Sequence, residues 1–183
     1  MLERNQKYER IPNYIVYFML YAMIGWVYEV LLEYFVWHHG FVNRGTLFGP
    51  WLPIYGFGTL FFLFCIYPII KGKPLKSRLK LIPVVFLGCM LSATLLELIT
   101  SYLCELTIGY VPWEYPEFKV LNFQNRIALN PSVRFGLGGL FFLYVVQPLF
   151  EKICLKLGDK TKGVSYFIIG VLIIDLICSL ILR

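Results

Sequence analysis

Long apolar stretches alternate with short polar connections along the whole chain. About 20 consecutive apolar residues cover the ~30 Å hydrocarbon core of a bilayer as a helix. Each stretch must be helical, because lipid offers no partner for exposed backbone groups. The pattern predicts an all-α integral membrane protein, a single transmembrane domain over residues 1–183. The expected bundle of about five spans covers residues 12–37, 52–70, 81–107, 132–150 and 164–182.

Composition supports this assignment. The chain has 183 residues, of which 58% are hydrophobic and only 15% are charged. A globular protein has ~25% charged residues, so a soluble enzyme, a disordered chain and a secreted disulfide scaffold are excluded. A nucleic-acid partner is disfavoured despite the net charge of +6. The five cysteines form no CxxC pair, and we interpret them as small apolar residues.

Basic residues are distributed unevenly between the two sides of the membrane. Cytoplasmic connections carry an excess of Lys and Arg, and the N-terminus together with the second and fourth connections holds 12 of the 17. We therefore expect a multi-pass protein with a cytoplasmic N-terminus and an external C-terminus. The inner set is Arg4, Lys7, Arg10, Lys71, Lys73, Lys76, Arg78, Lys80, Lys152, Lys156, Lys160 and Lys162. The outer set is Arg44, Lys119, Arg126, Arg134 and Arg183.

The two connections expected outside are rich in glycine, proline and aromatic residues. They cover residues 38–51 and 108–131. This composition predicts structured loops that fold back onto the helices or dip toward the membrane. Non-helical backbone at that depth must be buried by protein or must line a hydrated cavity.

Spans one and two resemble spans three and four. In each pair a carboxylate-bearing span is followed by Asn-Arg, at Asn43-Arg44 and Asn125-Arg126, and then by a glycine-rich span entry. Such a pattern predicts a parallel internal repeat about an axis along the membrane normal. The alternative is that any membrane hairpin has these features.

Carboxylates within the spans are the strongest candidates for a functional site. A charged side chain at mid-bilayer costs ~2.5–3.5 kcal/mol, so it usually faces the protein interior. At ~1.5 Å of rise per residue, Glu29 lies ~12 Å, Glu97 ~15 Å and Asp175 ~12 Å from the outer ends of their spans. We expect Glu29 and Glu97 to share a neighbourhood in the bundle core. The role of Asp175 is left open.

Arginines on the same side suggest charge pairing in a polar pocket. The planar guanidinium binds a carboxylate with two parallel hydrogen bonds. We predict that Arg44 bonds Glu29 or Glu33, and that Arg126 bonds Glu97 or Glu105. The pocket would bind a solute or headgroup; alternatively the pairs only pin the loops, or the carboxylates relay protons. The candidate binding residues are Glu29, Glu33, Asn43, Arg44, Glu97, Ser101, Glu105, Trp113, Asn125 and Arg126.

Motifs for enzymatic chemistry are missing from the sequence. The spacings of a nucleotide-binding P-loop, of G-x-S-x-G and of H-E-x-x-H do not occur. His38 and His39 have only Glu33 as an obvious further ligand. We therefore predict no metal and no cofactor, identify no catalytic residue, and consider an enzyme the less favoured interpretation.

Two sequence runs carry a family resemblance over residues 12–150. The first comprises residues 25–30 and 43–58, and the second runs from Glu97 to Gly136. Both resemble the family of small bacterial membrane proteins known as ABC-transporter type IV permeases. This chain has Glu114 and Pro116 where the family usually has aspartate and serine. It has Asn125 where the family usually has glycine before the second arginine.

The resemblance implies a permease-like protein of the bacterial cell membrane. Without a nucleotide-hydrolysis motif, transport would need a separate ATPase subunit or an ion gradient. A homo-oligomer is compatible with the sequence. One alternative is a membrane-embedded enzyme acting on a lipid-linked substrate, with Glu29 or Glu97 as general base. The other is a non-catalytic membrane assembly protein.

Overall fold

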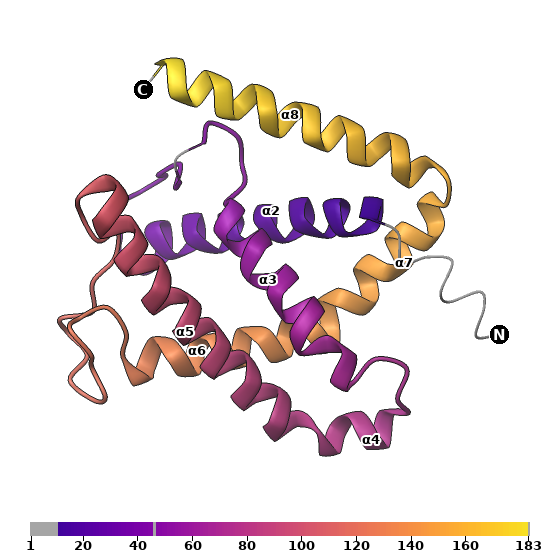
Figure 1. Ribbon diagram of the computed structural model, residues 1–183, viewed down its shortest axis with the longest axis horizontal. Coiled ribbons are helices and arrows are strands. Elements are labelled where there is room, and N and C mark those ends of the chain that lie inside the picture. Colours follow the sequence, from indigo (N-terminus) through magenta and orange to yellow (C-terminus); the bar gives the residue numbers. More distant parts are fainter. Residues whose placement is uncertain (1–10, 46, 183) are drawn as a thin grey trace. The chain divides into compact units, whose positions relative to one another are not determined.

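The computed structural model describes residues 11–45 and 47–182, and it is built from helices (Figure 1). Basic residues 4, 7, 10 and 183, which contribute to the predicted orientation, lie outside the described residues. The elements in chain order are α2 (Ile11–Phe35), α3 (Pro53–Cys65), η1 (Tyr67–Ile69), α4 (Leu75–Lys80), α5 (Ile82–Ile108), α6 (Leu129–Phe141), η2 (Phe142–Val146), α7 (Gln147–Leu157) and α8 (Lys160–Leu182).

Four helices in the described part of the chain are long and apolar enough to cross a membrane. They cover Ile11–Phe35, Ile82–Thr107, Leu129–Leu157 and Lys160–Leu182, and a shorter apolar helix covers Pro53–Ile69. Large apolar side chains such as Phe167, Ile174 and Leu180 stay exposed along α8. Apolar side chains on the outer face of a spanning helix contact lipid. The all-helical membrane fold is therefore confirmed, with the predicted second span as the shorter helix.

The predicted fourth span ended too early. Helix continues from Leu129 to Leu157, whereas the predicted span ends at residue 150, where the apolar run stops. Proline lacks a backbone N–H and disturbs the α-helical bonding at the residue four before it. A π-helical turn, η2, directly precedes α7, and Pro148 is the second residue of α7. Wider turns of this kind re-route the backbone bonds at such a point, so the helix passes the proline.

The helices form two compact units, which we describe separately. The first unit contains residues up to Leu60 together with those from Pro148 onward, and the second contains Phe61–Gln147. In the first unit α2 packs along α8 (Figure 1). Tyr21 of α2 is fully buried there and meets the Phe150 ring of α7 edge-on, with 4.9 Å between centroids.

In the second unit α5 packs against α6 (Figure 1). Small residues let two membrane helices approach closely. A Cβ atom on Gly136 would overlap the Phe86 ring, and one on Gly139 would overlap Cys89. Gly138 has no such neighbour. Gly136 and Gly139 therefore allow the close approach of α5 and α6, whereas Gly138 does not contribute to it.

Both long connections are structured by hydrogen bonds. In the 36–52 connection, the Leu52 amide bonds the Ala22 carbonyl of α2 at 2.9 Å. In the 109–128 connection, the Tyr115 amide bonds the Asn125 carbonyl at 2.8 Å, and Phe123 and Ile127 form an antiparallel bridge. Dipping of these connections toward the membrane stays a prediction.

Candidate functional site

The first polar cluster lies in the first unit and centres on Glu33, near the C-terminal end of α2. Both carboxylate oxygens of Glu33 are engaged: Oε1 lies 3.0 Å from a guanidinium nitrogen of Arg44, and Oε2 lies 2.7 Å from Nδ1 of His39. The Glu33 side chain is only 6% exposed, whereas Arg44 is 49% and His39 is 65% exposed. The buried Glu33 carboxylate therefore contacts two more exposed groups, the Arg44 guanidinium and the His39 imidazole.

Glu29 and Asn43 complete the first cluster. Tyr55, in the first turn of α3, donates a hydrogen bond from its hydroxyl to the Glu29 carboxylate. The Tyr55 ring also packs closely against Gly25 of α2. Asn43 accepts from the Trp26 indole at 2.6 Å and donates to the Phe48 carbonyl at 3.0 Å. These bonds fasten the connection that carries Arg44 to α2.

The second polar cluster lies in the second unit and centres on Arg126. Its guanidinium lies 2.6 Å from Glu105, 3.4 Å from the Ser101 hydroxyl and 4.2 Å from the centroid of the Tyr102 ring. Here the cation is the buried partner, since the Arg126 side chain is 11% exposed and that of Glu105 is 49% exposed. The second cluster therefore presents a carboxylate toward solvent.

Glu97 has a tyrosine partner like that of Glu29. Tyr115 donates its hydroxyl to Oε1 of Glu97 at 2.6 Å, and the buried Oε2 has no hydrogen-bond partner. The partner comes from a different position in each cluster: Tyr55 follows Arg44 in the chain, whereas Tyr115 precedes Arg126. Phe135, the residue that matches Tyr55 in the glycine-rich entry, has no hydroxyl to donate.

Arginine pairing was predicted correctly for both clusters. Of the alternatives given by the sequence, Arg44 pairs with Glu33 and Arg126 pairs with Glu105. Glu29 and Glu97 each contact a tyrosine instead. Because these two carboxylates belong to different units, their shared neighbourhood stays a prediction.

Two further predicted binding residues, Asn125 and Trp113, lie in the 109–128 connection. Asn125 has a φ of 58°, and its amide bonds the Asn122 side chain at 2.8 Å. Glycine and asparagine tolerate this left-handed conformation best. The conformation explains why asparagine can stand where the family resemblance has glycine. The indole nitrogen of Trp113 is buried without a hydrogen-bond partner.

Asp175 and the tyrosines were not recognised as partners from the sequence. Asp175 of α8 accepts from the Phe48 amide at 2.9 Å and from the Gly49 amide at 3.0 Å, one on each carboxylate oxygen. Because every residue except proline has a backbone amide, the sequence does not indicate which amides bind the Asp175 carboxylate. Tyrosine is common at membrane interfaces whether or not its hydroxyl has a special partner.

Two pockets in the described residues are lined by residues outside both clusters. One pocket of about 570 Å³ lies between residues 117–120 and 129–134, and another of about 370 Å³ lies between residues 48–51 and α8. None of the predicted binding residues lines either pocket. Among residues 11–45 and 47–182, no group of three or more His, Cys, Asp or Glu side chains is placed to hold a metal ion.

The long apolar helices define a multi-pass membrane protein, and its two arginine–carboxylate pairs lie near the C-terminal ends of α2 and α5. The chain belongs to the family described as Putative ABC-transporter type IV, whose model matches residues 16–180. The match confirms the family resemblance and extends it beyond residue 150 to include α8. No curated protein and no solved structure matches the chain significantly.

Proposed function

We propose that this protein is a permease-like membrane protein that binds an anionic solute or headgroup at Arg44. The observation that carries the proposal is the arrangement of Arg44 and His39 on the buried Glu33 carboxylate. Arg44 is half exposed and uses one terminal nitrogen for Glu33, which leaves other guanidinium N–H groups for a ligand. A guanidinium held in place by a buried carboxylate is well suited to bind phosphate or carboxylate.

The second cluster has a complementary role in this proposal. Arg126 is committed to Glu105, Ser101 and the Tyr102 ring, so it holds the 109–128 connection rather than a ligand. The exposed Glu105 carboxylate is available to a cationic group. Asn43, Asn125 and Trp113 act as positioning residues for the two connections.

Transport by this protein would draw energy from a second component or an ion gradient. The sequence has no P-loop spacing, and the family is an ABC-transporter family. We infer a separate ATPase subunit as the partner, and a homo-oligomer is also compatible with the sequence. The basic-residue distribution supports an external face for both clusters, and the two Asn-Arg pairs support a parallel repeat.

Thermal unfolding of the purified protein with inorganic phosphate or succinate tests the proposal. A ligand at 100 times its dissociation constant stabilises a protein by about 2.7 kcal/mol. We expect one of these anions to raise the melting temperature of wild type. Arg44→Lys should unfold like wild type without anion but lose the increase, because lysine lacks the planar fork.

Lys152→Gln is the matched control, because Lys152 is an exposed basic residue on α7. It should keep the full anion-dependent increase. An equal increase in Arg44→Lys and wild type would show that the anion binds elsewhere. No increase with either anion in wild type would contradict the assignment of Arg44 to phosphate or carboxylate binding.

A further inference from the structure

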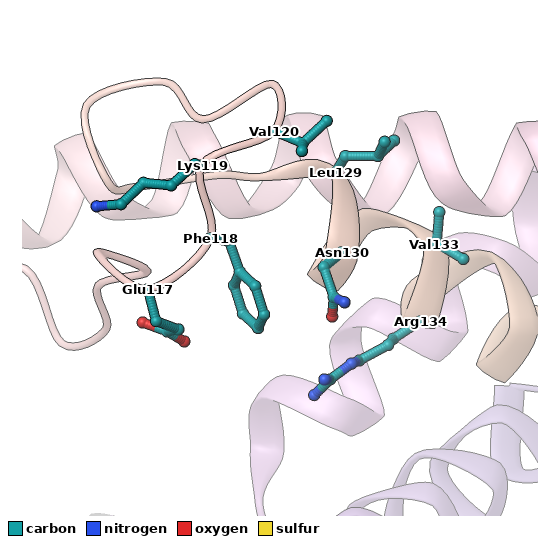
Figure 2. A pocket seen from close by; sticks show the side chains of 8 residues that line it. All are labelled: Glu117, Phe118, Lys119, Val120, Leu129, Asn130, Val133 and Arg134. Carbon is teal, nitrogen blue, oxygen red and sulfur yellow. The ribbon is translucent and has the colours of Figure 1, made fainter.

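The larger of the two pockets is lined by charged side chains that belong to neither cluster, namely Glu117, Lys119 and Arg134. It lies in the second unit between the 109–128 connection and the first turns of α6, with a volume of about 570 Å³. Figure 2 shows Asn130 and Arg134 on the α6 side of the Phe118 ring, and Glu117 across from them. We refer to it as the Arg134 pocket.

In the part of the chain that the structure describes, the Arg134 and Glu117 charges of the Arg134 pocket have no partner of opposite charge. Within the described residues, Arg134 and Glu117 form no ion pair with each other or with another side chain. The Arg134 guanidinium lies 5.7 Å from the centroid of the Phe118 ring. Lys119, which also lines the pocket, donates to the Pro116 carbonyl at 2.6 Å. Within the described residues, the pocket lining thus holds two cations, Arg134 and Lys119, and one anion, Glu117, none of which forms an ion pair.

The depth of Arg134 matches the headgroup layer of a bilayer. The span that begins at Leu129 has 29 residues, which at ~1.5 Å each gives ~43 Å. Hydrocarbon occupies ~30 Å and headgroups extend the bilayer to ~40–45 Å. Arg134 is five residues beyond Leu129, so it lies ~7 Å from the end of the helix. This is the boundary between headgroups and hydrocarbon.

We propose that the Arg134 pocket binds the headgroup of a phospholipid that carries both a phosphate and a primary amine, as phosphatidylethanolamine does. The guanidinium and the Asn130 amide donate to phosphate oxygens. The Glu117 carboxylate and the face of the Phe118 ring attract the ammonium. Val120, Leu129 and Val133 line the pocket with apolar surface for the glycerol and first methylenes. No residue of either polar cluster takes part, so the inference is independent of the proposed function.

Native mass spectrometry of the full chain, released from detergent, tests the headgroup preference directly. The probes are phosphatidylethanolamine, phosphatidylglycerol and phosphatidylcholine with identical acyl chains. Wild type should prefer phosphatidylethanolamine over the other two by about tenfold, the value of one charge-assisted hydrogen bond.

Two variants separate the contributions of the charges. Glu117→Gln should abolish the preference for phosphatidylethanolamine over phosphatidylglycerol and leave phosphatidylglycerol binding unchanged. Arg134→Gln should weaken all three lipids by about tenfold, because each carries the phosphate. Both side chains are exposed, so both variants should unfold at the wild-type temperature. Lys152→Gln should bind all three lipids like wild type.

Equal binding of the three lipids by wild type would overturn the proposal, as would wild-type lipid binding by Arg134→Gln. Soluble phosphorylethanolamine distinguishes a lipid from a free solute. It should displace phosphatidylethanolamine only at a concentration at least about 100-fold higher, because it lacks the apolar part. Displacement at equal concentration would assign the pocket to a free solute and overturn the lipid assignment.

Discussion

Asp175→Asn is the substitution that most sharply tests how the first unit holds its long connection. The carboxylate is buried in α8, and its oxygens accept the Phe48 and Gly49 amides at 2.9 and 3.0 Å. Asparagine has similar size and keeps one acceptor. Its NH₂ group then faces the other amide, so one donor loses its partner.

The expected loss of stability follows from these two bonds. A hydrogen bond to a charged group contributes about 1.5–3 kcal/mol, and a buried donor without a partner costs about 1–3 kcal/mol. These values describe the same event, so we expect a total loss of about 2–3 kcal/mol. For a chain of this length, such a loss lowers the melting temperature by about 4–12 °C.

Tryptophan fluorescence during thermal unfolding is a suitable assay, because Trp51 lines the same pocket as Asp175. Hydrogen exchange at the Phe48 and Gly49 amides should also become faster in Asp175→Asn. The matched control is Asp159→Asn, at an exposed carboxylate between α7 and α8, which should change stability by less than about 0.5 kcal/mol. The reasoning is refuted if both variants unfold at the same temperature.

Three further predictions concern the second cluster, the contact between Gly25 and Tyr55, and the orientation in the membrane. Arg126→Ala should destabilise the purified protein by about 2–3 kcal/mol, through the lost ion pair, the cation–π contact and buried side-chain packing, and Arg126→Lys by less; wild-type chemical denaturation in both would refute this. Gly25→Ala should cost about 1–3 kcal/mol by overpacking against the Tyr55 ring, whereas Gly170→Ala, which meets nothing within 4 Å, should unfold at or above the wild-type temperature. A cysteine at Ser77, with the native cysteines replaced, should resist impermeant reagents in intact cells, and labelling from outside would reverse the predicted orientation.

Much of the fold follows from patterns that the bilayer itself imposes. Long apolar runs predict spanning helices because unpaired backbone groups are costly in lipid. The predicted fourth span ends at residue 150, where the apolar run stops, whereas the helix continues through a π-helical turn and past Pro148 to Leu157. No sequence signal marked the π-helical turn at residues 142–146.

The candidate site could be predicted only where charge determines the partner. Arg44 and Arg126 had to find carboxylates, and the spans offered few. The sequence could not choose between Glu29 and Glu33, which lie one helical turn apart, because the choice depends on the path of the 36–52 connection. It also could not predict that Tyr115 binds Glu97. In the second half of the chain, the position that matches Tyr55 is Phe135, which has no hydroxyl, and the tyrosine partner comes from the 109–128 connection instead.

The central claim is that Arg44, held on the buried Glu33, binds an anionic group. An experimental structure of the full chain in lipid nanodiscs, prepared with phosphate and succinate, tests it most directly. The account predicts non-protein density about 3 Å from the Arg44 guanidinium, on the side away from Glu33. Arg44 enclosed by protein alone, or facing lipid chains with no polar density beside it, would contradict the account.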